Sequence, residues 1–210
     1  KKMGVLSVER NYKPVHLRFY TLLGSSSRYS FSEVISDVPD PIISFCWSPQ
    51  SEEECIVGTS TGYIYFVNTT NGEFTREPFS LEYLGEGEQN ATAIFCTYKY
   101  MITSGTSGNL YWLELDNLSK KDNIFTFDTR SPLLFMHILP GTDSLFFGSQ
   151  KNVLSSIDLN KETQQYVEDS WINLRNAHSG PITGVASLAK HVVTCGNDGT
   201  LRFWSFSPYL

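Results

Sequence analysis

The stretch from 177 to 206 constrains the fold of this chain more than any other. It holds three short apolar runs, at 181–188, 191–196 and 200–206, which are rich in β-branched and aromatic residues. Lys190 and His191 mark the first break between runs, and Asn-Asp-Gly at 197–199 marks the second. Runs of this length between turn residues are typical of strands in an antiparallel meander. The stretch therefore predicts three consecutive strands joined by tight turns.

The same unit recurs along the whole chain. When each repeat is aligned on the residue before its third strand, these residues lie 44 to 48 positions apart: Pro14, Gly62, Gly108, Asn152 and Gly199. This period is close to the ~40–45 residues of a four-stranded propeller blade. No stretch shows a convincing helical period. The sequence therefore predicts an all-β fold, a β-propeller of four-stranded antiparallel blades.

We expect one propeller segment over 1–210, with blades at about 1–38, 39–86, 87–129, 130–175 and 176–210. The first blade lacks an innermost strand and the last stops after its third, which leaves about 4.7 blades. In the second blade the outer strand is expected near 74–83, and in the fourth near 171–174. Polar connections are expected at 49–54, 118–123 and 160–169.

The stretch 177–206 also closely resembles a WD40 repeat, because a His opens it, an Asp-Gly turn precedes its last strand and a Trp ends that strand. The resemblance implies a buried, hydrogen-bonded tetrad of His178, Thr194, Asp198 and Trp204. In the family the Asp accepts from the His, the His reaches the Thr hydroxyl, and that hydroxyl meets the Trp N–H. The earlier repeats resemble the family by length and strand pattern only, with Phe19, Val67, Leu113 and Ile157 at the Trp position.

WD40 rings usually hold about seven blades. The resemblance therefore implies that these blades are part of a seven-bladed ring, completed by upstream chain or by a partner subunit. A compact ring of five blades is the other interpretation. The outer strand of the last WD40 blade commonly comes from the N-terminal segment, and the last repeat here ends after its third strand, as that closure would require.

Composition narrows the function classes. The net charge is −6 and the basic residues are scattered, so the sequence shows no basic footprint for direct nucleic-acid binding. The four cysteines lie in or beside apolar runs and none forms a CxxC pair, which indicates small buried side chains in a reducing compartment. No apolar run reaches the ~18 residues of a membrane span. We therefore expect an intracellular protein, nuclear or cytoplasmic, that does not bind membranes.

The chemistry-bearing residues favour no catalytic site. The tetrad could be mistaken for a hydrolase triad, but a buried network whose members satisfy one another is the better interpretation. The remaining histidines have no ligand at metal-binding spacing, and no Gly-rich phosphate loop occurs, so no metal or cofactor is expected. The predicted inner strands contain no carboxylate that could form a glycosidase pair. An enzyme is therefore not expected.

Recognition by propellers is carried by loops rather than by strands. On the face that the turns before the third strands share, the candidate partner-binding residues are Asp37, Asp40, Glu86, Glu88, Arg130 and Arg175. The first four make an acidic sector, which favours a partner with basic residues. For any single loop, plain solvated surface is the alternative.

These observations predict a non-catalytic scaffold that binds other protein subunits in a larger complex, including one that would complete the propeller. A nucleic-acid-associated subunit of a transcription or chromatin assembly is the alternative, and its basic surface would have to lie outside this sequence. A propeller enzyme is the third class. Choosing a particular complex would be analogy from the fold alone.

Overall fold

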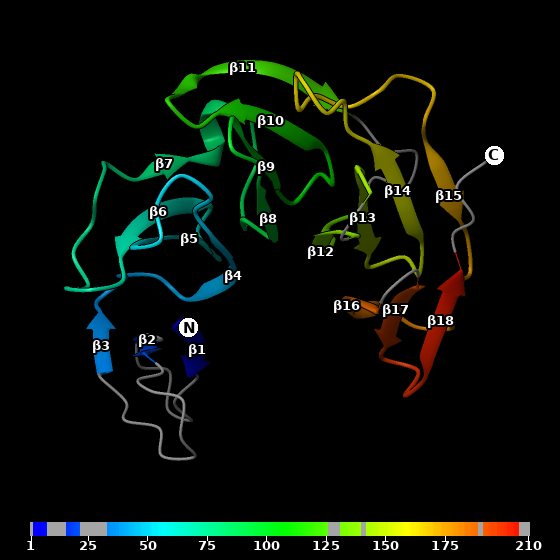
Figure 1. The fold of residues 1–210 in the computed structure, drawn as a ribbon, viewed down its shortest axis with the longest axis horizontal. Coiled ribbons are helices and arrows are strands. Elements are labelled where there is room, and N and C mark those ends of the chain that lie inside the picture. Colours follow the sequence, from blue (N-terminus) through cyan, green and yellow to red (C-terminus); the bar gives the residue numbers. More distant parts are fainter. Residues whose placement is uncertain are drawn as a thin grey trace. The chain divides into compact units, whose positions relative to one another are not determined.

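The computed structural model describes residues 2–7, 16–21, 33–125, 131–139, 142–188 and 191–205. Apart from one short 3-10 helix, the secondary structure of these residues consists of β-strands, which confirms the all-β prediction. The strands form five antiparallel sheets, each built from strands that are consecutive in the sequence (Figure 1). The chain divides into two compact units, Lys1–Ala91 and Thr92–Leu210.

The first unit contains two sheets. One is a three-stranded sheet in the order β1-β2-β3, and the other is four-stranded in the order β4-β5-β6-β7. The strands are β1 Lys2–Ser7, β2 His16–Thr21, β3 Glu33–Ser36, β4 Ile42–Trp47, β5 Glu54–Thr59, β6 Tyr63–Asn68 and β7 Phe79–Ser80, followed by the 3-10 helix η1 Leu81–Tyr83. The core of the four-stranded sheet includes Val57, Tyr65 and Val67.

The second unit contains three sheets: β8 to β11, β12 to β15, and β16 to β18. Their strands are β8 Ala93–Cys96, β9 Tyr100–Ser104, β10 Leu110–Glu114, β11 Asn117–Phe125, β12 Leu133–Ile138, β13 Ser144–Ser149, β14 Leu154–Asp158, β15 Ile172–Leu174, β16 Ile182–Leu188, β17 His191–Gly196 and β18 Leu201–Ser205. Within this unit the first strand of each sheet lies beside the first strand of the next, as β8, β12 and β16 show in Figure 1.

All five sheets lie inside the five predicted blade ranges. That they form one continuous propeller segment stays a prediction.

The repeat has a physical basis in one turn. Gly62, Gly108, Asn152 and Gly199 precede the third strand of their sheets, and all four have positive φ angles, of 83°, 79°, 66° and 73°. Each donates its backbone N–H to the carbonyl oxygen three residues earlier, at 3.1 to 3.3 Å. Glycine and asparagine adopt this left-handed conformation at the least cost, which explains why they recur at this point of the repeat. The first anchor, Pro14, lies outside the described residues.

Packing of the sheets against one another explains the nearly continuous apolar runs. The second strands β5 and β9 are buried at every position, as their nearly continuous apolar runs predict. Trp112, Phe147 and Ile157 join the sheets β8–β11 and β12–β15 in one cluster. Phe146 and Trp204 belong to a second cluster, which joins the sheets β12–β15 and β16–β18. Strand β17 is less buried, with the buried residues Val192 and Thr194 separated by the half-buried Val193.

Two local predictions differ from the structure. The outer strand predicted near 74–83 is reduced to β7, a single bridge at Phe74 and the 3-10 helix. Pro78 lacks a backbone N–H for a strand ladder, and the Ser80 side chain accepts from the N–H of Glu82, which starts a helical turn instead. Residues 118–123, predicted as a connection, lie in β11, which pairs with β10 through two register shifts.

Candidate functional site

The last sheet brings together the four residues that the sequence singled out. His178 lies in the connection from β15 to β16, Thr194 in β17, Asp198 in the turn from β17 to β18, and Trp204 in β18. His178 Nδ1 is 3.0 Å from Asp198 Oδ1, and His178 Nε2 is 2.7 Å from Thr194 Oγ1. Trp204 Nε1 donates to Thr194 Oγ1 at 2.8 Å. The four side chains thus form one continuous chain of hydrogen bonds.

The hydrogen-bond donors in this network can be assigned by starting from Trp204 and Asp198. Trp204 Nε1–H can only donate and the Asp198 carboxylate can only accept. His178 Nδ1–H therefore donates to Asp198, and in the neutral imidazole Nε2 then accepts from the Thr194 hydroxyl. His178 is 1% exposed and Thr194 is fully buried, so neither could exchange these partners for water. A side chain at Gly196 would place its Cβ only 2.5 Å from His178 Nδ1, which explains the glycine beside the ring.

The Asp198 carboxylate is held by more groups than the tetrad contains. The backbone N–H of Ser179 donates to it at 2.9 Å and the Thr200 hydroxyl at 2.8 Å. The Ser179 N–H, followed by the bond from His178, holds the pKa of Asp198 far below its ordinary range. Sequence reasoning missed both Ser179 and Thr200. The signal for Thr200 was local, because Asp side chains commonly accept from the N–H two residues on, as here at 3.1 Å.

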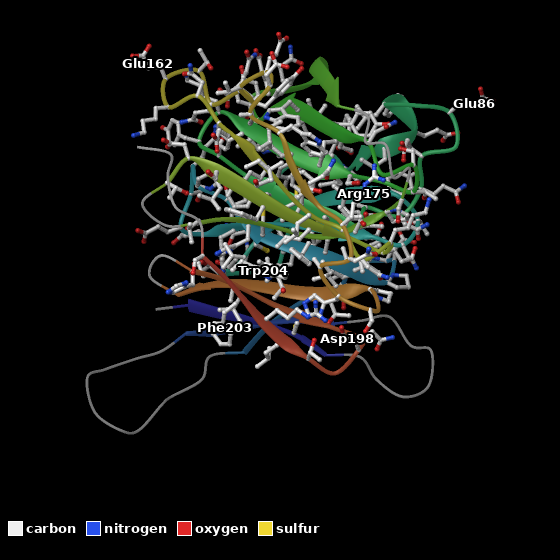
Figure 2. All side chains as sticks on the ribbon, turned by 90° about the vertical axis from the view of Figure 1, so that its right-hand side faces the viewer. Glu86, Glu162, Arg175, Asp198, Phe203 and Trp204 are labelled. Carbon is white, nitrogen blue, oxygen red and sulfur yellow. The ribbon has the colours of Figure 1, made fainter. Side chains whose placement is uncertain are left out.

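This arrangement is suited to holding a turn and not to catalysis. Nucleophilic catalysis needs a hydroxyl that a substrate can reach. The Thr194 hydroxyl is buried and is bonded to both His178 and Trp204 inside the sheet, where a substrate cannot reach it. The tetrad instead ties the β15–β16 connection and the β17–β18 turn to the centre of β17. Figure 2 places Asp198 and Arg175 toward one end of the strands of this unit and Glu162 toward the other.

The candidate acidic residues all belong to the first unit, but they differ in accessibility. Asp37 and Glu86 are exposed. Asp40 is half-buried and accepts the hydroxyl of Tyr65 at 3.1 Å. Burial, together with this bond to Asp40, raises the pKa of Tyr65 to about 12. Asp37 and Glu86 are thus exposed on these loops, and Asp40 is engaged by Tyr65.

Glu88 is not the exposed loop residue that the sequence predicted, because it is only 5% exposed. Its N–H closes a turn onto Gly85 O, and the chain from 88 to 90 packs against the turn at Gly62. Arg175 is exposed, in the second unit, on the turn after β15. Arg130 lies outside the described residues.

Charge is distributed unevenly along the chain. Residues 37–91 contain ten Asp or Glu and a single basic residue, Arg76. The Arg76 guanidinium lies 3.3 Å from the buried carboxylate of Glu54 and 4.6 Å over the ring of Phe66. The only cation of this segment is therefore already paired. Sequence reasoning recognised the acidic loops but not that the acidic character extends over the whole segment.

The exposure of three aromatic side chains in the same segment was not predicted from the sequence. Tyr63 is 41% exposed, Phe74 44% and Tyr83 80%. The sequence pattern places all three residues in predicted strands, whose side chains are expected to be covered by neighbouring sheets.

Among the described residues, no group of three His, Cys, Asp or Glu side chains is placed to hold a metal ion. That part of the chain also has no helix with the length and apolar character that crossing a membrane requires.

Comparison of the sequence with protein-family models and with curated proteins finds no match. The fold, in contrast, is similar to solved structures. The RRP9 WD40 repeats and U3-55K each superpose with a TM-score of 0.62 at 18% identity, over 79% of this chain and 48% and 49% of theirs. The chain thus spans about half the length of these two proteins. The computationally designed Ika8 protein superposes with a TM-score of 0.58 at 14% identity, over 96% of this chain and 57% of its own. Together with the antiparallel sheets, these similarities confirm that the chain has the fold of a WD40-like β-propeller.

Proposed function

We propose that this protein is a non-catalytic interaction scaffold, a subunit of a larger intracellular complex in the nucleus or cytoplasm, and that its first unit recruits a partner protein through that partner's basic residues. The observation that carries the proposal is the ten-to-one excess of acidic over basic residues in 37–91. Electrostatic complementarity of this kind steers association and selects partners of opposite charge.

The arrangement of the polar side chains supports a scaffold over an enzyme. The His178–Thr194–Asp198 set is internal to one sheet and its hydrogen bonds are satisfied there. The exposed charges, such as Asp37 and Glu86, lie on connections between strands, where partners are usually bound.

The last sheet supports a second part of the proposal, that another protein surface packs beside it. Leu201 and Phe203 of β18 are 66% and 63% exposed, and they alternate along the strand with Trp204, so they lie on the opposite face of the sheet. Figure 2 labels Phe203 and Trp204 on this strand. The corresponding side of the sheet β8–β11 is buried by its neighbour. A partner subunit, or another part of the ring, that completes the propeller would cover Leu201 and Phe203. The mass of particles formed with and without the co-purifying subunit tests this, and a stable monomer would contradict it.

The cysteines support an intracellular setting. Cys46, Cys55, Cys96 and Cys195 form no disulfide bond, and Cys55 and Cys96 are buried. Burial, with the nearby Cys46, raises the pKa of the Cys55 thiol well above its ordinary value, so it is unreactive. Buried cysteines without disulfide bonds are usual in reducing compartments.

Charge reversal on the two exposed acidic loops tests the recruitment. The Asp37→Lys/Glu86→Lys variant should lose a stoichiometric partner that co-purifies with the tagged protein from its own cells. The matched control is Glu162→Lys/Glu168→Lys, which makes the same charge change at exposed positions of the second unit. The control should retain the partner.

Two results would contradict the proposal. One is a partner that both variants retain equally. The other is tight, salt-sensitive binding of RNA or duplex DNA by the purified protein alone, which would favour the nucleic-acid-associated alternative.

A further inference from the structure

A cavity of about 220 Å³ opens beside the outer strand of the sheet β4–β7. It is lined by Tyr63, Pro78, Ser80, Glu82 and Tyr83. The side chains come from three consecutive features of the chain. Tyr63 starts β6, Ser80 pairs with it from β7, and Glu82 and Tyr83 follow on the 3-10 helix. The truncation of the outer strand after Ser80 is therefore what creates the cavity.

Two lining residues, Tyr63 and Tyr83, belong to groups of neighbouring aromatic rings. Phe74, Tyr65 and Tyr63 form a row, with centroid distances of 5.1 and 6.3 Å. The ring centroid of Tyr83 lies 6.2 Å from that of Phe79. Tyr83 is 80% exposed, although a large ring is usually at least partly covered. Of the rings that line the cavity, Tyr63 is 41% exposed and Tyr83 is 80% exposed, so both present aromatic surface to solvent there.

The polar groups that line the cavity retain hydrogen-bonding capacity for a ligand. Among the residues that the structure describes, no hydrogen bond reaches the hydroxyl of Tyr63 or of Tyr83. Ser80 Oγ accepts from the backbone N–H of Glu82 at 3.3 Å, which leaves its own O–H free to donate. The Glu82 carboxylate lies at the same cavity, and the only cation of the surrounding segment, Arg76, is paired with Glu54. The cavity thus offers donors, aromatic faces and an unpaired negative charge.

We propose that this cavity binds an extended, proline-rich segment of a partner protein that carries an Arg or Lys beside its prolines. This inference deepens the proposed scaffold function, because it names the kind of segment that the acidic unit recruits. Aromatic-lined grooves bind proline-rich segments through their preformed polyproline II helix, which loses little entropy on binding.

Each feature of the cavity has a counterpart in such a segment. Proline rings pack against the faces of Tyr63 and Tyr83. Polyproline II has no internal hydrogen bonds, so its carbonyls accept from the tyrosine hydroxyls and from Ser80. The basic residue at the end of the proline run pairs with Glu82, with the acidic segment around it adding long-range attraction.

The test uses three fluorescent synthetic peptides of equal length, measured by fluorescence anisotropy with the whole protein. The first has a core of Pro-Pro-Ala repeats flanked by arginines. The second has the same core flanked by glutamates. The third has the arginines but a Gly-Ser core. We expect the first to bind at least about tenfold more tightly than either of the others.

Substitutions of single residues test whether the first peptide binds at this cavity. Tyr83→Ala removes an exposed ring without touching the core and should weaken the first peptide by about tenfold, as truncation of an aromatic anchor does. Glu82→Gln should weaken it about two- to fivefold, since exposed ion pairs contribute little. Tyr98→Ala is the matched control, because Tyr98 is 63% exposed but lies in the second unit. It should leave binding unchanged.

The outcomes separate this inference from the scaffold proposal. If the arginine peptides with Pro and Gly-Ser cores bind equally, charge alone acts and the proline-binding cavity is refuted while the acidic recruitment stands. Equal binding by the Tyr83→Ala variant and the parent would also refute the cavity. If none of the peptides binds at about 1 mM, weaker than ordinary peptide recognition, both the cavity and the charge-based recruitment are overturned.

Discussion

Replacing Thr194 by valine removes the middle of the buried hydrogen-bond chain while keeping the shape of the side chain. The Thr194 hydroxyl is the shared partner of His178 Nε2, at 2.7 Å, and of Trp204 Nε1, at 2.8 Å. Valine is β-branched like threonine and suits strand β17. The substitution should therefore report the loss of the hydroxyl with little change in packing.

The expected effect follows from the atoms left without partners. A buried polar atom that loses its hydrogen bond costs about 1–3 kcal/mol. His178 is 1% exposed and would lose its acceptor bond entirely, whereas Trp204 is only half-buried. We therefore expect Thr194→Val to lower the free energy of unfolding by about 2–4 kcal/mol, with both atoms contributing.

Thr103 provides a matched control. It occupies the equivalent place in β9, is also fully buried, and its hydroxyl makes one bond, to the carbonyl oxygen of Ala93 at 3.2 Å. Thr103→Val should cost about 0.5–1.5 kcal/mol, the net value of one ordinary hydrogen bond. The free energy of unfolding of both variants is measured by urea denaturation, monitored by tryptophan fluorescence and circular dichroism.

A double-mutant cycle that combines Thr194→Val with Trp204→Phe measures the coupling energy between these two residues. Once the indole N–H is absent, Thr194→Val leaves one unsatisfied atom instead of two, so it should cost less than in the parent by about 0.5–2 kcal/mol. The reasoning is refuted if Thr194→Val costs no more than Thr103→Val, or if the effects in the cycle simply add.

Two further predictions concern the turns. The pKa of Asp198 is depressed in the folded protein from its ordinary value of 3.8, so the stability that its charge supplies is fully present above about pH 4 and is lost as the pH falls toward the folded pKa. The free energy of unfolding should therefore fall between about pH 4 and 2, and this slope should be shallower in Asp198→Asn; equal slopes in acid-denaturation curves would contradict the assignment. Gly108→Ala should destabilise more than Gly199→Ala, because both have positive φ but an added Cβ at Gly108 would lie 2.3 Å from Ser131 O, whereas Gly199 has no atom within 4 Å. Thermal melts that show equal losses would refute this ranking.

The parts of the fold that could be predicted depend on rules that act over a few residues. The anchors Gly62, Gly108 and Gly199 were recognisable because a left-handed turn needs glycine or asparagine wherever it occurs. The tetrad could be predicted because His178, Asp198 and Trp204 stand where the resemblance to a WD40 repeat implies its members. The candidate site was less predictable, since Glu88 carries the same charge as Glu86 and only its surroundings differ.

By itself, the sequence determined the all-β class and the blade period, because strand patterning and turn residues are properties of neighbouring residues, and its resemblance to a WD40 repeat implied the tetrad. Only the tertiary structure decided which side chains are accessible. Pro78 and Ser80 end the outer strand early, and this exposes Tyr83 beside Tyr63, twenty residues away in the chain. The packing of 88–90 on the Gly62 turn buries Glu88. Burial depends on which distant segments meet, and no local pattern of residues carries that information.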